Sequence, residues 1–345
     1  MLLLSLVVPI FNMEAYLEKC LESILRQGLN DNEYEVILVN DGSKDRSQFI
    51  CKQYVEKHQN FHLINQKNQG VAVARNVGIS AARGKFVGFI DPDDYLLDNG
   101  LSIAFRKYAD REDVDLIHFY SSYDFWDIKP IQDEIEYWGT THDFLANNDC
   151  GLPSFCWIYI YRKEFLDRHN IRFKPYRVGE DQLFISTVFI ANARYLSCKA
   201  DIYRYVVRDS SASTNRSIDY ARKSVIDYFN AYNDIIKAMN SYGVTKNLIL
   251  YNACIRSLNS KKTFGFSRIL TASYTYNEFA GIKSFGKKIG FIPFKSYNNG
   301  LKSKSISIVE NFVLNNYMIY KIASYLFNYI ITPYIMPRLR VSFNR

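Results

Sequence analysis

The sequence predicts an α/β fold in which a mostly parallel sheet is flanked by helices and followed by a helical C-terminal region. Apolar runs of strand length alternate with segments of helical periodicity through the first 120 residues. This alternation is typical of βαβ units with parallel strands. Charge divides the chain similarly, because residues 1–215 carry a net charge of −6 and residues 216–345 a net charge of +14. The basic part is expected to meet an anionic surface.

Each element is predicted from its apolar pattern and its flanking polar residues. Continuous apolar runs suit strands that are buried on both faces. Spacings of three and four residues, as from Leu17 to Leu25, indicate helices, and Asn12 is a plausible cap for the first of them. Strands are predicted at 2–10, 34–39, 61–65, 86–90 and 115–120. Helices are predicted from about 17, and at 45–57, 71–82, 101–108, 220–238 and 247–260.

Polar residues follow three of these strands, at 9–12, 40–45 and 91–94. Ligands of parallel sheets bind outside the carboxyl ends of the strands, so these three segments should converge. The sequence Asp41-Gly42-Ser43 is also ordinary turn and helix-cap chemistry when taken alone. The sequence lacks GxGxxG after the first strand and GxxxxGK[ST] anywhere, which argues against a dinucleotide fold and a P-loop.

Three carboxylates end the strand at 86–90, in the sequence Asp91-Pro92-Asp93-Asp94. Crowded carboxylates raise each other's pKa unless a cation lies between them. A hard divalent ion such as Mg²⁺ or Mn²⁺, shared with substrate phosphates, suits such a cluster. The alternative is an acidic turn before the next helix. Asp94 is expected to pair with a basic neighbour.

Five motifs resemble those of family 2 glycosyltransferases with the GT-A fold, the inverting nucleotide-sugar enzymes of bacterial polysaccharide assembly. They occur in the family's order over roughly residues 1–215. Each motif is loose alone, and five in order are specific. They are VVPIFN (Val7–Asn12), VNDGSKD (Val39–Asp45), NQGVAVARNVGI (Asn68–Ile79), FIDPDDYL (Phe89–Leu96) and GEDQLF (Gly179–Phe184).

The resemblance implies a binding site for a nucleotide diphosphate sugar, with UDP as the expected nucleotide. Asp41 would accept the imide N–H of uracil, and Arg75 would approach the ribose and diphosphate. Asp91 and Asp93 would form the DxD pair that holds Mg²⁺ or Mn²⁺, with Asp93 as the direct ligand. The implied donor-binding residues are Pro9, Asn12, Asp41, Asn68, Arg75, Asn76, Asp91, Asp93, Arg208 and Ser211. For Asn76, capping of the local backbone is an equally good alternative to donor binding.

Catalysis is expected at Glu180 and Asp181. These acids open a predicted helix, where carboxylates are favoured by the helix dipole alone. An inverting transfer also requires a base for the acceptor hydroxyl, and the resemblance implies Asp181 in this role with Glu180 as support. Trp157 is expected at the acceptor site, since aromatic rings stack on sugar faces; about half of such aromatics simply fill a core.

The predicted domains are a catalytic domain at 1–215 and a basic, mostly helical region at 216–345. The catalytic domain would have a nucleotide-sugar half at about 1–120 and an acceptor half at about 121–215. The uncharged run Ile322–Pro337 has 16 residues, short of the roughly 20 that span a bilayer. It is expected to contact an anionic membrane peripherally, and the alternative is packing on the catalytic domain.

Six scattered cysteines without a CxxC pair favour free thiols in a reducing compartment. The N-terminus lacks a basic leader and a cleavage site, so the protein is expected to be cytoplasmic, at the inner face of the membrane. The expected partners are a nucleotide diphosphate sugar and a glycan or polyprenyl-diphosphate-linked acceptor, without nucleic acid. The expected function is sugar transfer in surface polysaccharide synthesis. The alternatives are a sugar nucleotidyltransferase and a non-catalytic carbohydrate-binding or scaffolding relative.

Overall fold

The computed structural model describes residues 2–125, 127, 131–132, 134–148, 151–208, 217–294, 301–329 and 331. The chain folds into two compact units. Segments that are distant in sequence contribute to each unit, so the chain passes between them more than once. The first unit contains Met1–Asn147, Pro153–Pro175 and Glu180–Arg208, and the second contains Asn148–Leu152, Tyr176–Gly179 and Asp209–Arg345.

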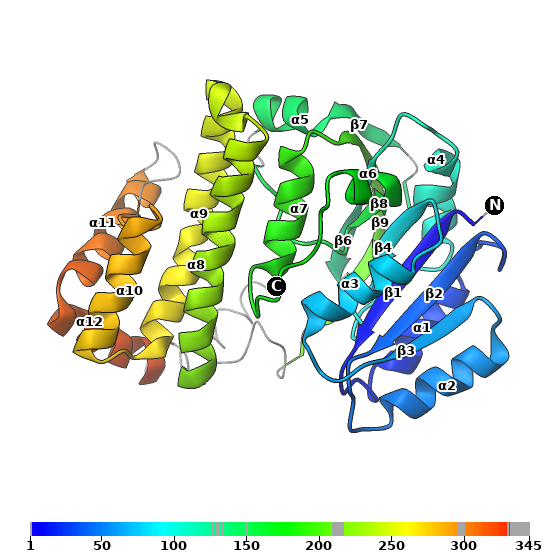
Figure 1. The fold of residues 1–345 in the computed structure, drawn as a ribbon, viewed down its shortest axis with the longest axis horizontal. Helices are drawn as coiled ribbons and strands as arrows, with labels where there is room; N and C mark the ends of the chain where they lie inside the picture. The colour runs from blue at the N-terminus through cyan, green and yellow to red at the C-terminus, as the bar shows by residue number, and fades with distance from the viewer. Residues whose placement is uncertain are drawn as a thin grey trace. The chain divides into compact units, whose positions relative to one another are not determined.

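Four parallel strands form one half of the sheet in the first unit (Figure 1). Their spatial order is β3-β2-β1-β4. Every residue of β1, β2 and β4 is buried, which explains their nearly continuous apolar sequences. The parallel βαβ half that the sequence predicts is therefore confirmed. The strands are β1 (Leu4–Ile10), β2 (Tyr34–Asn40), β3 (Phe61–Asn65) and β4 (Phe86–Phe89).

Three helices connect these strands: α1 (Leu17–Leu25), α2 (Ser47–Lys57) and α3 (Val71–Ala81). Helix α3 packs on β1 and β2. Its Gly78 permits this close approach, because a Cβ at that position would lie 2.2 Å from Cγ1 of Val7 on β1. A side chain there would push α3 away from the sheet.

The second half of the sheet is mixed in direction. Strand β8 lies antiparallel between β4 and β6, whereas β6 and β9 run parallel to each other. The full order is β3-β2-β1-β4-β8-β6-β9-β5, and β7 pairs with β9. The strands are β5 (Tyr95–Leu96), β6 (Leu116–Tyr123), β7 (Ile135–Thr140), β8 (Tyr159–Arg162) and β9 (Arg194–Tyr205). The helical segments here are η1 (Ser102–Arg106), α4 (Lys107–Ala109), α5 (Thr141–Asn147), α6 (Lys163–Arg168) and α7 (Glu180–Ile190).

Two local predictions differ from the structure. The helix predicted at 101–108 is an irregular π-helical turn, η1, followed by the single short turn α4. Asn12 does not cap α1, whose N-cap is Tyr16. Instead Asn12 has a φ of 54°, a left-handed conformation that Asn tolerates better than most residues. It ends β1 and redirects the chain.

The described part of the second unit is helical. Its long helices α8 and α9 pack against each other. The aromatic residues Phe291, Phe294 and Tyr320 are buried in its core. These aromatic residues of the basic C-terminal region therefore mainly stabilise the fold. The elements are α8 (Ile218–Ser241), η2 (Val244–Lys246), α9 (Leu248–Ala272), α10 (Tyr276–Lys288), α11 (Leu301–Asn315) and α12 (Tyr317–Leu326).

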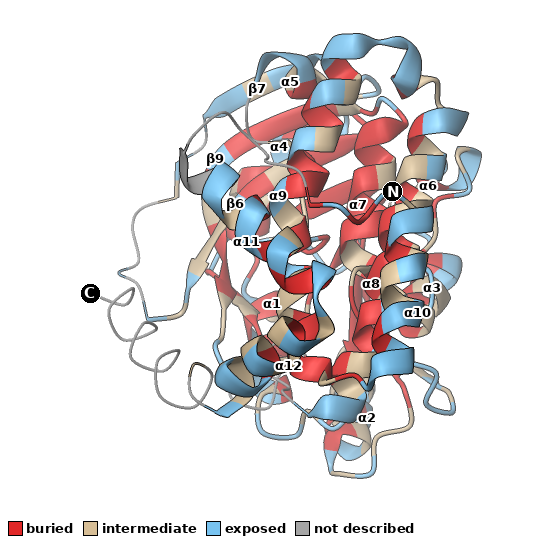
Figure 2. Cartoon of the chain, turned by 90° about the vertical axis from the view of Figure 1, so that its left-hand side faces the viewer, coloured by how far each residue is buried: buried red, intermediate tan, exposed pale blue. Residues whose placement is uncertain are grey.

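Helices α11 and α12 have exposed apolar residues on one face, and Figure 2 shows these helices in a mixture of pale blue, tan and red. The opposite faces are packed, with Leu314 and Tyr320 buried. The expected membrane contact of Ile322–Pro337 and its alternative, packing on the catalytic domain, stay predictions, because residues 330 and 332–337 lie outside the described residues. Among the residues described, no helix is long and apolar enough to cross a membrane. The exposed apolar residues are Ile308, Val309, Phe312, Met318, Ile322, Tyr325, Leu326 and Tyr329.

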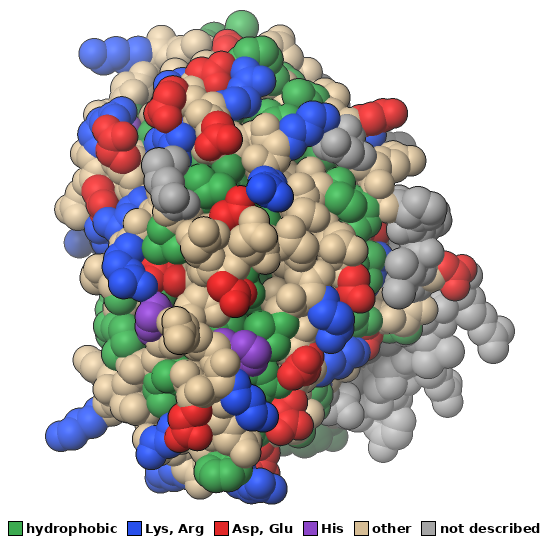
Figure 3. Space-filling view, turned by 90° about the vertical axis from the view of Figure 1, so that its right-hand side faces the viewer, with side chains coloured by type: hydrophobic (Ala, Val, Ile, Leu, Met, Phe, Trp, Pro, Cys, Tyr) green, Lys and Arg blue, Asp and Glu red, His purple; other side chains and the backbone are tan. Residues whose placement is uncertain are grey.

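The surface charge is mixed on the face of the molecule that Figure 3 shows. Acidic and basic side chains lie interspersed over this face. The net charge of −6 in residues 1–215 therefore does not form one acidic surface there. Local clusters of carboxylates are more informative about function than this overall charge.

Candidate active site

The carboxyl ends of β1, β2 and β4 lie at one edge of the sheet, because the three strands are parallel neighbours. The loops after β1 and β2 are joined by hydrogen bonds. Asp41 N donates to Ile10 O at 2.8 Å, and Lys44 N donates to Asn12 Oδ1 at 2.8 Å. Asn12 N donates to Ser43 Oγ at 3.1 Å. Asn12 therefore holds the β2 loop in place.

Asp41 is buried at this edge and fixes the loop that leads into α3. Its Oδ1 accepts from Gln66 Nε2 at 2.7 Å and from Gln69 N at 2.9 Å. Its Oδ2 accepts from Gly70 N at 2.8 Å. A carboxylate oxygen has two lone pairs, so Oδ2 retains one acceptor position. Asp41 therefore mainly holds this loop in place, and its Oδ2 atom can accept one further hydrogen bond from an N–H group.

The neighbouring residues explain why this loop is close-packed. Gly42 has a φ of 74°, and a Cβ there would lie 2.9 Å from Asn68 N. Only glycine tolerates both conditions. Asn68 itself is exposed, whereas Pro9 is buried within β1. Of these two predicted donor-binding residues, only Asn68 presents its side chain to solvent.

Asp94, the third acid after β4, has a structural role. Tyr203 Oη donates to its Oδ2 at 2.7 Å, and Val206 N donates to its Oδ1 at 2.8 Å. The prediction that Asp94 pairs with a basic neighbour was wrong. Tyr203 Oη also accepts from Asp91 N at 3.2 Å, so one tyrosine on β9 orients the acidic loop.

Asp91 and Asp93 instead pair with arginines. Arg75 Nη2 lies 2.9 Å from Asp91 Oδ1. Arg208 Nε forms an ion pair with Asp93 Oδ2 and its guanidinium lies beside the ring of Tyr16. Burial raises the pKa of Asp93, the Asp91 carboxylate raises it further, and Arg208 opposes the shift. Burial is thus the main cause of the raised pKa of Asp93.

The N-terminus of α7 adds a second pair of acids. Arg75 Nη1 lies 3.3 Å from Glu180 Oε1, so this buried arginine joins the acids of α7 to Asp91. Asp181 Oδ1 accepts from Gln182 N at 2.7 Å, the only side-chain hydrogen bond found for Asp181 within the described chain. Arg75 thus brings the two predicted acid pairs into one cluster.

Burial raises the pKa values of both Glu180 and Asp181. For Glu180, the Asp181 charge adds to the effect of burial and Arg75 opposes it. For Asp181, burial is again the largest cause, and Arg75 acts in the opposite direction. A carboxylate with a raised pKa is a stronger base once it has lost its proton. Asp181 therefore has both the electrostatics and the unused acceptor capacity of a base.

Asn76 binds the backbone of Phe173, a residue distant in sequence. Its Nδ2 donates to Phe173 O at 2.8 Å, and its Oδ1 accepts from Phe173 N at 2.9 Å. The ring of Phe173 lies 5.2 Å from the Arg75 guanidinium, so Asn76 supports Arg75 indirectly.

Trp157 is 7% exposed and stacks on Tyr203 at a centroid distance of 4.4 Å. Trp157 therefore supports the tyrosine that holds the acidic loop.

Sequence reasoning missed Tyr203, which contacts both Asp91 and Asp94. Tyrosines at 203 and 205 stand two apart, on the same face of a strand, and this spacing is the only sequence signal for the role. Ser211, the last predicted donor-binding residue, lies outside the described residues.

Two buried thiols lie beside the acids. Cys20 Sγ is 3.7 Å from Asp91 O. Burial raises the pKa of Cys20, and the carboxylates of Asp94, Asp93 and Asp91 raise it further. Burial also raises the pKa of Cys156, with Arg75 opposing the shift. Both thiols stay protonated, so neither is a nucleophile.

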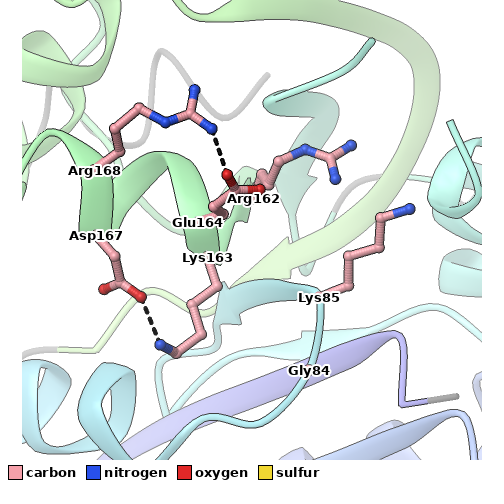
Figure 4. Close-up of a pocket in the computed structure, with 7 residues that line it drawn as sticks. All are labelled: Gly84, Lys85, Arg162, Lys163, Glu164, Asp167 and Arg168. Atoms are coloured by element: carbon pink, nitrogen blue, oxygen red, sulfur yellow. Dashed lines mark hydrogen bonds and ion pairs between the residues drawn. The ribbon is translucent and has the colours of Figure 1, made fainter. Parts of the chain in front are cut away.

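A hollow of about 630 Å³ in the first unit lies elsewhere. Figure 4 shows charged side chains around it, and two ion pairs among them. Lys163 pairs with Asp167 at 2.6 Å, Arg168 pairs with Glu164 at 2.5 Å, and Lys85 pairs with Glu112 at 2.7 Å. Lys85 precedes β4, at the strand end opposite the acidic loop. This hollow is separate from the candidate active site.

The acidic loop fits a divalent cation that is shared with phosphate groups. Asp91 and Asp93 offer the carboxylate oxygens that Mg²⁺ and Mn²⁺ prefer, and each is paired with an arginine, Arg75 or Arg208. Among the described side chains, no three of His, Cys, Asp or Glu gather to hold a metal. One or two carboxylates with substrate phosphates are a usual Mg²⁺ site.

Comparison with known proteins identifies the family. Residues 5–169 match the family described as Glycosyl transferase family 2. Glycosyltransferase EpsJ of Bacillus subtilis (strain 168) is 32% identical over 265 residues, covering 74% of each chain. Poly(ribitol-phosphate) beta-N-acetylglucosaminyltransferase TarP of Staphylococcus aureus (strain N315) is 27% identical over 248 residues, covering 70% of this chain and 74% of TarP.

The fold comparison agrees. The crystal structure of S. aureus TarS 1–349 in complex with UDP-GlcNAc has a TM-score of 0.56 and 19% identity, covering 91% of this chain and 90% of that one. Fold and family match together define a glycosyltransferase of the GT-A fold. The chain belongs to glycosyl transferase family 2.

Proposed function

We propose that this protein is an inverting, metal-dependent transferase that moves one sugar from a UDP-linked donor to a hydroxyl group of a glycan in surface polysaccharide synthesis. We further propose that this acceptor glycan is linked to a polyprenyl diphosphate at the inner face of the membrane. The single observation that carries the proposal is the acid cluster around Arg75. This buried cation lies 2.9 Å from Asp91 and 3.3 Å from Glu180. One site thus contains carboxylates for a diphosphate-bound cation and a separate acid pair for proton transfer.

The donor end is proposed at the edge where β1, β2 and β4 finish. The remaining acceptor position on Asp41 Oδ2 suits the imide N–H of uracil, and exposed Asn68 lies in the next loop. The UDP-GlcNAc complex of TarS supports a uridine nucleotide. Arg208 supplies a guanidinium beside Asp93, where a diphosphate and its cation would bind.

The chemistry follows from the two acid pairs. The acceptor hydroxyl oxygen forms a bond to the anomeric carbon, while the bond from that carbon to the diphosphate oxygen breaks on the opposite face. Asp181 takes the hydroxyl proton. Glu180 forms an ion pair with Arg75 and supports Asp181 in this role. Asp93 and Asp91 would hold a divalent cation, which would neutralise charge on the departing diphosphate.

Calorimetric titration of UDP in the presence of Mn²⁺ or of EDTA tests the proposal. We expect much weaker UDP binding in EDTA. Asp98→Asn, a change at an exposed acid paired with Arg26, serves as the control and should bind UDP normally with Mn²⁺. Equal UDP affinity with and without the metal would refute metal dependence, and binding of GDP without UDP would refute the uracil assignment.

We also propose peripheral membrane contact through α11 and α12. The exposed residues Met318, Ile322 and Tyr325 stand at helical spacing on one face of α12. The net charge of +14 in residues 216–345 suits anionic lipid, with about 1 kcal/mol for each basic residue near the surface. Apolar insertion and charge together give reversible docking.

Co-sedimentation with anionic and neutral vesicles tests this contact. The triple change Met318→Ser, Ile322→Ser and Tyr325→Ser should weaken binding to anionic vesicles, as should added salt. The matched control is Leu248→Ser with Ile249→Ser, two exposed apolar residues at the start of α9. If the triple change and the control bind alike, α12 is not the contact. Truncation is a poorer test, because it would uncover the buried face that includes Tyr320.

A further inference from the structure

A hollow of about 510 Å³ lies in the second unit, and three parts of the chain line it. Ser217 caps the N-terminus of α8, and Ser273 ends α9. The remaining wall belongs to α12 and the turn that follows it, with Lys321, Tyr325 and Tyr329. Hydroxyl groups and one lysine therefore line the hollow.

The wall that α12 forms is fixed to the end of α9 by hydrogen bonds. Tyr320 Oη donates to Ile269 O at 3.1 Å. Ser324 Oγ donates to Leu270 O at 2.6 Å, and Asn328 Nδ2 donates to the same carbonyl at 3.3 Å. The last carbonyl groups of a helix lack partners within that helix. These contacts satisfy two such carbonyls of α9 and hold α12 beside the hollow.

Lys321 brings a positive charge to the hollow. Its Nζ lies 3.5 Å from Ser273 Oγ, and the described part of the chain shows no carboxylate paired with it. The ammonium group has three N–H donors, so at least two remain for a ligand. Acids at the starts of α8 and α10 pair with other cations, in the pairs Asp219–Lys223 at 2.8 Å and Glu278–Arg222 at 3.1 Å.

Ser273 adds a hydroxyl at a position where glycine is the usual residue. It ends α9 with a φ of 47°, in the left-handed region that helices commonly reach just after their last turn through glycine. Serine is less at ease in this conformation. Its hydroxyl can accept from Lys321 and still donate its own proton to an anion.

Exposed apolar side chains lie beside the lysine. Tyr325 and Tyr329 both line the hollow, are 61% exposed, and have ring centroids 4.9 Å apart. Ile322, the residue after Lys321, is 59% exposed. A small soluble anion would leave these side chains in water, whereas an anion that carries hydrocarbon would cover them. Tyrosine suits such a boundary, because it has an apolar body and a polar tip.

We propose that this hollow binds the phosphate-bearing headgroup of an anionic phospholipid, with the phosphate at Lys321. The inference rests on the proposed membrane contact of α12 and makes that contact specific for a headgroup. Hydrogen bonds from an ammonium group to phosphate oxygens are strengthened by charge, and basic pockets of this kind bind lipid headgroups. The hydroxyl of Ser273 would donate to the same phosphate, and the acyl chains would lie toward Ile322 and Tyr325.

Calorimetric titration of the full chain with short-chain lipids tests the proposal. The probe is dihexanoyl phosphatidylglycerol below its micelle-forming concentration, compared with dihexanoyl phosphatidylcholine and with glycerol 3-phosphate. We expect the phosphatidylglycerol to bind most tightly, because it alone combines a net negative charge with acyl chains. Equal binding of glycerol 3-phosphate would assign the hollow to a free phosphate compound and overturn the lipid proposal. Absence of binding by the phosphatidylglycerol would also overturn it.

Lys321→Gln should weaken binding of the phosphatidylglycerol by about tenfold, because a charge-assisted hydrogen bond is lost. Lys321→Arg keeps the charge and should retain most of the affinity. The matched control is Lys246→Gln, which removes the same charge at an exposed lysine of η2. This segment joins the end of α8 to the start of α9, away from the hollow. Equal weakening by Lys246→Gln would mean general charge attraction and would overturn the proposal.

Ser273→Gly separates lipid binding from folding. Glycine suits a φ of 47° better than serine does, so thermal denaturation should show a stability at least equal to that of the unchanged protein. Binding of the phosphatidylglycerol should weaken a few-fold, because one hydroxyl donor is lost. If Ser273→Gly and Lys321→Gln both bind this lipid as the unchanged protein does, the proposal is wrong.

The proposed function is judged by other measurements. A short-chain lipid in solution needs no membrane, so its titration reports on the hollow alone. If anionic vesicles bind the unchanged protein and Lys321→Gln alike, only the headgroup proposal fails. If neither the vesicles nor the short-chain lipid bind, the membrane contact fails as well. Metal-dependent UDP binding supports the transferase in either case.

Discussion

Two buried carboxylate sites, one in each unit, have the same electrostatic character and different surroundings. Burial raises the pKa of Glu180 and Asp181 on α7, and it raises the pKa of Glu310 on α11 to about 7. Around α7 a buried arginine and a second set of acids converge. Around Glu310 only Thr263 and Lys262 oppose the shift, and Oε1 has no hydrogen-bond partner in the described structure.

The difference shows that a raised pKa alone does not define an active site. Lys262 donates to Gly290 O at 3.0 Å and lies over the rings of Tyr232 and Phe291, so Glu310 belongs to a packed helical core. A functional site needs opposed charges arranged around a space for substrate. Opposed charges of this kind meet at Arg75, which pairs with Asp91 and Glu180.

The largest expected effect separates the two sites directly. Asp181→Asn should reduce sugar transfer by at least about 10²-fold, because it removes the general base, and should leave UDP affinity close to normal. Glu310→Gln should transfer at the normal rate. Transfer assays with a radiolabelled nucleotide sugar measure both variants. If Asp181→Asn keeps nearly full activity, the base lies elsewhere in the cluster.

A second change addresses the acids after β4. Asp93→Ala should weaken UDP binding with Mn²⁺ by about tenfold or more, because a carboxylate ligand is lost. In EDTA the same variant should bind UDP much as the unchanged protein does. Calorimetry under both conditions decides the point. An equal loss with and without Mn²⁺ would assign Asp93 a role unrelated to metal.

The pH dependence of transfer gives the next comparison. Asp181 must be deprotonated to act as a base, and burial raises its pKa. The rate should therefore rise with pH about tenfold per unit below an apparent pKa that is higher than the ordinary carboxyl value of about 4. Saturating donor at every pH excludes a binding effect. A transfer rate that falls at low pH with the ordinary carboxyl pKa would contradict the assignment of Asp181 as the base.

The smallest effect concerns stability. The pKa of Glu310 is about 7 in the folded state and about 4.3 when unfolded. Between these values the folded state holds more protons, so the free energy of unfolding should fall as pH rises, by up to about 1.4 kcal/mol per unit. Glu310→Gln should remove this part of the slope in urea titrations between pH 4.5 and pH 7. The same slope in the variant would assign it to other groups.

The pattern of apolar residues in the sequence made much of the fold predictable. Strands β1, β2 and β4 are buried on both faces, and helical spacing separates the four parallel strands, so local sequence carries their parallel order. The antiparallel insertion of β8 between β4 and β6 depends on contacts far apart in sequence, and no local pattern encodes it. Likewise the turn at 101–108 has helical composition, yet it is distorted into a π-helical turn by tertiary packing.

The site was predictable where residue type restricts chemistry. Asp91 and Asp93 were singled out because crowded acids are costly without a reason, and Glu180 and Asp181 because their motif resembles that of the family and an inverting transfer needs a base. Their partners were not predictable: Tyr203 lies 109 residues from the Asp94 carboxylate that it binds. Trp157 was assigned to the acceptor by type, and only the ring contacts show that it is a support.

The two buried thiols make opening of this site measurable by chemical labelling. Cys20 and Cys156 are 0% exposed, and burial disfavours the thiolate that alkylating reagents require. Iodoacetamide can therefore modify them only in molecules whose acid cluster has transiently come apart. Mass-spectrometric labelling rates at these two positions give the frequency of such openings. A bound donor that closes the cluster should slow both rates together.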